Sequence, residues 1–598
     1  MNSTGGIVLA VMMLLTATDV ILRYVFNKPI TASFELTEIL LSIVIIFGLA
    51  YVTLLKEHIR IDFIISKFPL RVQTLVHCVT TIIGIAALIL ITWQTFQYGI
   101  YVKDGGDTTA ILRIPTYPFI WIATIGIAIF VISYFSVLFD YLAQLIADIK
   151  PWHAVGLVLA VVIISLLFAI PVMGNVLPFD ISPFVLGILS LIILIVLIFA
   201  GMNIGLAMAV MGFLGMSYIS GLDAGLVRMG TVPFNTVSSH GFSVIPLFIL
   251  MGVFCYHAGL ISDLYYTMHK WFGQLRGGLA MATVAGCAGF AAVCGSSTAT
   301  VATMGMVALP EMRRYKYDTR LATGAIAAGG SIGSMIPPSI ILIIYGILTE
   351  ESIGKLFLAG FIPGITEALF YLITIYIICR RSPIMGPPGP QVNFTEKLVS
   401  LKGTWGVLAL FILVLGGIYT GVFTPTEAAG VGAFGAFLFA LGRRRLSWKI
   451  ISDSLSDTTK NTSMCFIILI GALIFNYLLA VSRVPFELAN FAANLEVNRY
   501  IILGIIMVIT LILGCFMSGM AIMMLTIPIF FPVIMAFDFN PIWFGILVTR
   551  MTEIGVITPP IGINVFVMYG VAKDIPMQTI FKGIVPFLIA DVFHIAML

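Results

Sequence analysis

The chain has 598 residues, of which 60% are hydrophobic and only 10% are charged, and its mean hydropathy is +1.11. This composition excludes a soluble protein folded around one hydrophobic core and predicts a protein that has the lipid bilayer as its solvent. The net charge is only +4, and we expect no nucleic-acid partner. The seven cysteines include no CxxC pair, so we interpret them as small buried residues rather than as metal or redox sites.

Four apolar segments come first, at about residues 5–25, 34–55, 72–101 and 116–147. Each is long enough to cross the apolar core of a bilayer, which is about 30 Å thick and takes about 20 helical residues. The loop between the second and third segments carries the most Lys and Arg, which places that loop in the cytoplasm. The sequence therefore predicts a four-helix module over residues 1–150 with its amino terminus in the cytoplasm.

A fifth apolar segment, at about residues 152–173, follows this module. It predicts a linking transmembrane helix over residues 151–175, which carries the chain to the outer side of the membrane. The loop that follows contains no Lys or Arg, as expected on that side. The larger module, residues 176–598, begins there.

The larger module contains an internal repeat. A shift of 222 residues places Ser296 on Ser518 and aligns SIGSMIPP at 331–338 with EIGVITPP at 553–560. Near the start of each copy, a shift of 220 residues aligns a set of small residues. One structural unit has therefore been duplicated. The repeat divides the module into a first copy at about 184–347, an arm helix at 356–379, a second copy at about 403–571 and a C-terminal helix at 577–598.

The second copy is predicted to be inverted in the membrane. An odd number of crossings between the two starts reverses the direction of the second copy. Those crossings are five spans, near residues 184–200, 206–221, 243–258, 321–347 and 356–379. The loop charges agree, because residues 313–320 contain four Lys or Arg whereas the matching residues 536–540 contain none. The predicted fold class is an all-α polytopic membrane protein with an inverted repeat.

Each copy contains an apolar stretch that is interrupted in its middle. Residues 279–312 are broken at CGSST (294–298), and residues 499–536 are broken near MSG (517–519). Each half is too short to cross the bilayer alone, which predicts two re-entrant hairpins. Their polar tips should face the protein interior, because an unpaired peptide group in lipid costs several kcal/mol.

Paired prolines interrupt the span after each hairpin. Pro337-Pro338 and Pro559-Pro560 supply no N–H, so carbonyl groups at 333–336 and 555–558 lose their helical partners. Such pairs also occur as simple kinks or packing points in membrane helices. Two breaks in register, each after a hairpin with an aligned serine, favour ion sites instead. A Na⁺ ion takes about five or six oxygens, so the two copies predict two sodium sites.

The broken helices also expose new helix amino termini. Their N–H groups and positive dipole ends suit an anionic substrate. These termini are expected near Thr298, Ser339, Ser518 and Ile561.

Arg550 and Glu553 are opposite charges within one span, three residues apart and therefore on one helical face. Charge inside the membrane is costly, so a functional role is the first interpretation. Arg550 suits a carboxylate or sulfonate of the substrate. An intrahelical ion pair that neutralises itself is the alternative, and the sequence leaves both open.

Other charged residues have simpler interpretations. Glu427 is expected to make a buried polar contact between helices rather than to belong to the site. The span-end residues of the four-helix module are expected to pair at the membrane interface. They are Glu35, Glu38, His58, Arg60 and Asp62.

Several long motifs resemble one family. AGGSIGSMIPPSIILIIYG (328–346), SIGKLFLAGFIPG (352–364), GVFTPTEAAGVGA (421–433) and TEIGVITPPIGINVFVMYG (552–570) resemble the large membrane subunit of TRAP (tripartite ATP-independent periplasmic) transporters. DVILRYVFN (19–27) and EHIRIDF (57–63) are similar to the family's small membrane subunit. The resemblance covers nearly the whole chain and indicates a fused small-plus-large form.

The resemblance implies Na⁺-driven import of an organic acid anion that a separate extracytoplasmic binding protein delivers. It implies a transporter rather than an enzyme, a bacterial inner membrane, a monomeric membrane component and Na⁺ as the only metal. It also implies an elevator mechanism, in which hairpins and broken helices move across a scaffold. That scaffold comprises the amino-terminal helices and the spans near 184–200, 356–379, 403–420 and 464–482.

By motif match, the resemblance implies sodium ligands at the tips and the breaks. They are Gly295, Ser296, Ser297, Thr298, Gly333, Met335 and Pro337 in the first copy, and Ser518, Gly519, Gly555, Ile557, Thr558 and Pro559 in the second. The candidate substrate ligands are Thr300, Ser334, Ser339, Asn564 and Arg550. The two tip sequences, CGSSTAT and FMSGMAI, differ from each other, so the individual ligands stay open.

Three other functions compete with this interpretation. A stand-alone Na⁺/dicarboxylate-type symporter needs no binding protein, but it also has no evident need for the amino-terminal module. An intramembrane enzyme with Ser296 or Ser518 as nucleophile lacks a histidine in either hairpin or broken span to act as base. A passive channel is the third. The anion itself is left open among sialic acid, C4-dicarboxylates, other carboxylates and small sulfonates.

Overall fold

The computed structural model describes residues 2–146, 181–495 and 497–598. Within these ranges the regular secondary structure is helical, apart from one isolated bridge between Thr108 and Pro115. Eleven of the described helices are long and apolar enough to cross a membrane. The chain is therefore an all-α, multi-pass membrane protein, as predicted. The predicted linking helix, residues 151–175, lies outside the described residues.

The amino-terminal segment forms four helices whose bounds lie close to the predicted spans. They are α1 (Asn2–Phe26), α2 (Ser33–Leu54), α3 (Leu70–Gly105) and α4 (Tyr117–Ile146). α2 packs against α1 and α4, and α3 packs along α4. Gly126 of α4 fits against Ile46 of α2, where a Cβ atom would lie only 1.9 Å from Ile46 Cγ2. Small residues of this kind let membrane helices approach closely.

The described chain divides into two compact units. Unit 1 contains the described parts of residues 1–243 together with 455–495, and unit 2 contains residues 244–454 and the described parts of 496–598. The larger module is therefore split between the units, because its helices pack with partners that are distant in sequence.

In unit 1, the amino-terminal helices are joined by the first helices of the larger module. These are α6 (Pro183–Phe199), α7 (Ile204–Ser220), α8 (Leu222–Val237) and η2 (His240–Ser243), with α20 (Val484–Asn494) and residues 455–482 of α19 (Trp448–Ser482). Gly205 of α7 lies on α19, where a Cβ atom would be 2.1 Å from the Ile467 carbonyl oxygen.

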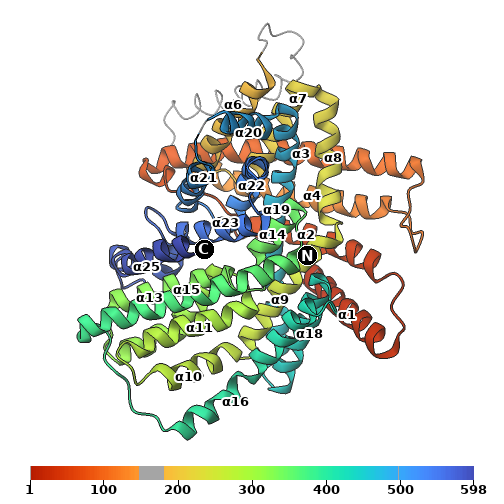
Figure 1. The fold of residues 1–598 in the computed structure, drawn as a ribbon. Helices are drawn as coiled ribbons and strands as arrows, with labels where there is room; N and C mark the ends of the chain where they lie inside the picture. The colour runs from red at the N-terminus through yellow and green to blue at the C-terminus, as the bar shows by residue number, and fades with distance from the viewer. Residues whose placement is uncertain (1, 147–180, 496) are drawn as a thin grey trace. The chain divides into compact units, whose positions relative to one another are not determined.

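Unit 2 holds both predicted hairpins and both predicted breaks. Its first part contains α9 (Val244–His257), α10 (Leu260–Phe272), α11 (Gly278–Cys294), α12 (Ser297–Arg314), α13 (Thr319–Ser331), η3 (Ile332–Ser334), α14 (Ile340–Thr349), α15 (Ile353–Arg381) and η4 (Pro383–Met385). Its second part contains α16 (Phe394–Phe411), η5 (Ile412–Gly416), α17 (Gly417–Tyr419), α18 (Pro425–Gly442), α21 (Arg499–Gly514), α22 (Gly519–Ala536), α23 (Pro541–Gly555), α24 (Ile563–Val571) and α25 (Met577–Met597). α10, α11 and α13 lie side by side, with α15 along α11 (Figure 1).

The implied scaffold is divided between the two units. The spans near 184–200 and 464–482 correspond to α6 and part of α19, which belong to unit 1 with the amino-terminal helices. The spans near 356–379 and 403–420 correspond to α15 and to α16 with the helical turns after it, which belong to unit 2 with the hairpins.

The helix bounds extend the repeat beyond the predicted limits. A shift of 222 residues carries α11, α12, α13 and α14 onto α21, α22, α23 and α24, and it also carries α10 onto α20 and α15 onto α25, within two residues at the start of each helix. The arm helix and the C-terminal helix, which we had treated as separate elements, are therefore equivalent members of the two copies.

Four of the described α-helices lie outside the predicted spans, namely α18, which has the length and hydropathy of a span, and three others. α8 contains Asp223, Arg228 and the internal Pro233, α10 contains Asp263 and Lys270, and α20 is only 11 residues long. Because these three helices are short or carry charges, an apolar window of about 20 residues does not detect them.

Candidate functional site

The first predicted hairpin is a helix, a short break and a second helix. α11 ends at Cys294, Gly295 adopts a left-handed conformation with φ of +65°, and α12 begins at Ser297 after an extended Ser296. Glycine suits this position because it has no Cβ atom to oppose a positive φ. The helix-break-helix pattern is confirmed, whereas its re-entry from one side of the membrane stays a prediction.

The tip of this hairpin lies against the break between α13 and α14. A Cβ atom on Gly333 would lie 2.8 Å from Thr300 Oγ1 and 3.0 Å from the Ser296 carbonyl oxygen. The backbone N–H of Ile340 donates to the Gly295 carbonyl at 3.4 Å. Gly295, Ser296 and Gly333, three of the predicted sodium ligands, therefore lie close together in space.

Two predicted substrate ligands hold this arrangement in place. Thr300 Oγ1 donates to the Ser296 carbonyl at 2.8 Å. Ser339 Oγ donates to the Ser334 carbonyl at 2.5 Å and accepts the N–H of Leu342, so it also caps α14. In this conformation Thr300 and Ser339 orient the tip and the break.

The second copy repeats the contact between tip and break. A Cβ atom on Gly555 would lie 2.5 Å from the Cα atom of Gly514, so the backbones of α23 and α21 touch. The N–H of Gly562 donates to the Cys515 carbonyl at 3.3 Å, as Ile340 does to Gly295 in the first copy. Gly519 lies against Thr552, with 3.1 Å between its added Cβ atom and Thr552 Cγ2. In both copies the Pro-Pro peptide bond of the break is cis.

Several buried polar atoms around the second break have no hydrogen-bond partner. They are Ser518 Oγ, Thr552 Oγ1, both carboxylate oxygens of Glu553 and both side-chain polar atoms of Asn564. Buried polar groups are usually hydrogen-bonded, and unpaired groups in a membrane protein suit a ligand. Ser518 and Asn564 are therefore the predicted residues whose side chains are best placed to bind one. Thr552 was not predicted as a ligand, although it begins the motif at 552–570 and precedes Glu553.

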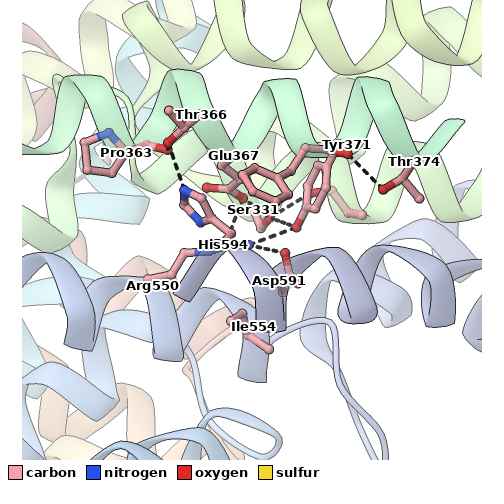
Figure 2. A network of polar contacts seen from close by, with 12 residues as sticks. Ser331, Pro363, Thr366, Glu367, Tyr371, Thr374, Arg550, Ile554, Asp591 and His594 are labelled. Atoms are coloured by element: carbon pink, nitrogen blue, oxygen red, sulfur yellow. Dashed lines mark hydrogen bonds and ion pairs between the residues drawn. The ribbon is translucent and has the colours of Figure 1, made fainter. Parts of the chain in front are cut away.

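Arg550 lies in a buried polar network and not beside a free surface (Figure 2). Its guanidinium donates to Glu367 Oε1 at 2.6 Å, to the Tyr371 hydroxyl at 3.2 Å and to Asp591 Oδ1. Ser331 Oγ donates to the same oxygen of Glu367 at 2.8 Å.

These contacts bear on both roles considered for Arg550. The intrahelical ion pair with Glu553 is wrong, because both carboxylate partners of Arg550 come from other helices, α15 and α25. The substrate role stays a prediction, and in this conformation the side chain is fully buried and already bound by two carboxylates. Glu367 and Asp591 were not predicted, since each is the single acidic residue of a mainly apolar helix.

The remaining charged residues have local roles. Glu427 caps α18, since Thr424 Oγ1 accepts the N–H of Glu427 while Glu427 accepts the N–H of Thr424. Its side chain is only half-buried, whereas we expected a buried contact. In unit 1, Arg60 pairs with Asp62 at 2.9 Å, as expected for the interface of the module. Burial, together with the neighbouring Arg60, lowers the pKa of His58 to about 3, so His58 is neutral at physiological pH.

Comparison with known proteins identifies two component families in this chain. Residues 12–144 match the tripartite ATP-independent periplasmic transporters, DctQ component, and residues 191–598 match the tripartite ATP-independent periplasmic transporter, DctM component.

Curated relatives align with most or all of the chain. The sialic acid TRAP transporter permease protein SiaT of Haemophilus influenzae is 26% identical over 98% of this chain and 94% of its own length. The isethionate TRAP transporter permease protein DctMQ of Oleidesulfovibrio alaskensis is 28% identical over 87% of this chain and 79% of its own. The C4-dicarboxylate TRAP transporter large permease protein DctM of Vibrio cholerae is 33% identical over 67% of this chain and 92% of its own.

The two component matches and the relatives that span the fusion agree with the four amino-terminal helices and the paired hairpins. The chain belongs to the TRAP transporter family and is a permease in which the small DctQ-type and large DctM-type components are fused.

Proposed function

We propose that this permease is a sodium-coupled secondary importer of an organic acid anion, a carboxylate or a sulfonate. It receives the anion from an extracytoplasmic binding protein and moves it by an elevator mechanism. It acts as a monomeric component of a bacterial inner membrane, with its amino terminus in the cytoplasm. The family works with such binding proteins, and the three relatives reported above are named for sialic acid, isethionate and C4-dicarboxylates.

The observation that carries this proposal is the pair of tip-and-break contacts in unit 2. Each copy brings a hairpin tip against a proline-broken helix, where backbone carbonyls and hydroxyl groups supply the oxygens that a hard cation takes. The unpaired side chains of Ser518 and Asn564 lie at the second tip and the second break. Two such places support two sodium ions around one anion site.

Sodium coupling is energetically sufficient. One charge that crosses a potential of about 100 mV gains about 2.3 kcal/mol, and a tenfold gradient adds about 1.4 kcal/mol. Two sodium ions therefore supply roughly 7 kcal/mol before the work of moving the anion's own charge is subtracted.

Uptake by proteoliposomes tests the proposal. We expect substrate accumulation only when an inward Na⁺ gradient and the loaded binding protein are both present. Accumulation with Na⁺ but without binding protein would support the stand-alone symporter instead. Downhill flux that depends on neither the Na⁺ gradient nor the binding protein would support a channel.

The paired prolines provide a second test of the ion sites. The double substitution Pro337→Ala and Pro338→Ala restores N–H groups at the first break and should abolish Na⁺-dependent accumulation. The matched change of Pro383 and Pro387 to alanine, in the loop around η4, should leave it unchanged. If the first variant kept normal Na⁺ dependence, the first ion site would lie elsewhere.

A further inference from the structure

Glu553 is a charged side chain without a partner in the middle of unit 2. It is 0% exposed, and neither of its carboxylate oxygens has a hydrogen-bond donor. An ionised carboxylate in such a place costs several kcal/mol of solvation free energy, so a proton or a bound cation must compensate its charge.

The nearest guanidinium does not provide that compensation. Arg550 is bound by Glu367 and Asp591, which already outnumber it. It is the one Lys or Arg among the buried side chains that the structure describes. With Glu553 included, there are three carboxyl groups and one guanidinium. His594 of α25 lies in the same polar network (Figure 2), and even its protonation would leave an excess of negative charge.

The surroundings of Glu553 are those of the first ion site, although Glu553 belongs to the second copy. α23 contacts η3, and the hydroxyl-bearing side chains of Ser334 in η3 and Ser297 at the start of α12 lie against the Glu553 carboxylate. Both serines are buried. Both hydroxyls lie close enough to interact with the Glu553 carboxylate, but neither contact meets the geometry of a hydrogen bond.

A cation suits this set of oxygens better than another hydrogen-bond donor. Hard cations bind carboxylate and hydroxyl or carbonyl oxygens together, and the Ser296 carbonyl lies next to Gly333, in the same break. A monovalent cation at this point also reduces the excess negative charge.

We propose that Glu553 provides the charged ligand of the cation site at the first tip, together with the side-chain oxygens of Ser297 and Ser334. This inference rests on the proposed sodium coupling and deepens it. The first site is then shared by the two copies, because its tip comes from α12 and its carboxylate from α23.

The 222-residue alignment of the two copies also indicates that the two ion sites differ in their ligands. The residue equivalent to Glu553 in the first copy is Ser331, and its hydroxyl donates to Glu367. The second site therefore receives no carboxylate from this position. Loss of Glu553 should remove one charged site and leave the neutral one.

Sodium binding to the purified chain in lipid nanodiscs tests this inference without binding protein or transport. NaCl is titrated against choline chloride at constant ionic strength, and both heat of binding and Tm are measured. We expect Glu553→Gln to raise the Kd for Na⁺ at one site at least tenfold. In choline chloride alone its Tm should equal or exceed that of the unchanged protein, because an uncompensated charge has been removed. Glu350→Gln, in the exposed loop after α14, should behave as the unchanged protein.

Each contrary result has one meaning. If the Kd for Na⁺ is unchanged in Glu553→Gln, the inference is overturned but sodium coupling stays in place. The same holds if the Tm of Glu553→Gln falls in choline chloride, because that fall indicates a structural role for Glu553. If Glu553→Gln does not fold, Glu553→Asp and Ser334→Ala should each raise the Kd at least threefold, and an unchanged Kd would overturn the inference. If the unchanged protein neither binds Na⁺ nor needs it for uptake, the proposed function itself fails.

Discussion

At the scale of single residues, Arg550 shows how a buried charge is accommodated in this protein. One guanidinium is held by carboxylates of two other helices and by the hydroxyl of Tyr371. Because all four side chains are buried, the network fixes α23 against α15 and α25 rather than offering a surface to a ligand. Buried networks of this kind are costly to break even where they add little net stability.

Substitution of Arg550 should therefore reduce stability before it affects substrate recognition. Arg550→Gln leaves Glu367 and Asp591 as unpaired buried carboxylates, and breaking a buried pair costs about 3–5 kcal/mol. The expected result is a marked fall in Tm, measured by thermal unfolding in detergent. Arg313→Gln, which breaks the exposed pair with Asp574, should change Tm little.

A different result would support the substrate role of Arg550. If Arg550→Gln kept a normal Tm but lost uptake at low substrate concentration, the guanidinium would have to leave the network during transport.

At the scale of elements, the hairpin tips and helix breaks form two equivalent contacts. Each depends on glycines that allow backbone or side-chain oxygens to approach, such as Gly333 beside Thr300 and Gly555 beside Gly514. The prolines end the first half of each broken helix, and the capping hydroxyl of Ser339 starts the second half of the first one. Local sequence thus determines where each helix breaks, and close packing determines what the break touches.

Gly333→Ala should disrupt the first contact. Its methyl group would meet Thr300 Oγ1 and the Ser296 carbonyl at 2.8 and 3.0 Å, and overpacking of this kind costs about 1–3 kcal/mol. We expect about a tenfold or greater loss of Na⁺ affinity, measured by the Na⁺ dependence of uptake. Gly504→Ala in α21, where an added Cβ atom meets nothing within 4 Å, should retain normal affinity. If Gly333→Ala and Gly504→Ala had the same Na⁺ affinity, the hairpin tip would tolerate displacement without loss of the ion site.

At the scale of the whole molecule, the repeat extends through α15 and α25, so each copy includes a helix that carries part of the buried network. Glu367 lies on α15 of the first copy, and Asp591 lies on α25 of the second. Arg550 therefore connects equivalent helices of the two copies. This relation was not predicted, because we had ended the copies at residues 347 and 571.

The inverted arrangement predicts opposite accessibility of equivalent positions. Arg314 and Ala536 are related by the 222-residue shift, and both lie exposed at the end of the second hairpin helix. In whole cells, a membrane-impermeant thiol reagent should label Ala536→Cys but not Arg314→Cys, whereas permeabilised cells should show both. The described native cysteines are buried except for the partly exposed Cys294, so background labelling should be low. Labelling of both positions from outside would contradict the inversion.

The sequence by itself determined the membrane class, most of the spans, the duplication and the places where helices break. These properties depend on local composition, on apolar length and on prolines and glycines, which act over a few residues. Of the helices outside the predicted spans, α8, α10 and α20 are short or charged. These three helices form because unit packing supplies what their own apolar length does not.

Only the tertiary structure decided which charges are satisfied. Arg550 and Glu553 are three residues apart, yet Arg550 binds Glu367, 183 positions away, while Glu553 faces Ser297 and Ser334 of the other copy. A long side chain takes whichever partner the packing of neighbouring helices brings within reach, and no local pattern records that choice. Because Arg550 is bound elsewhere, Glu553 has no charged partner, and this is the basis of the proposed shared cation site.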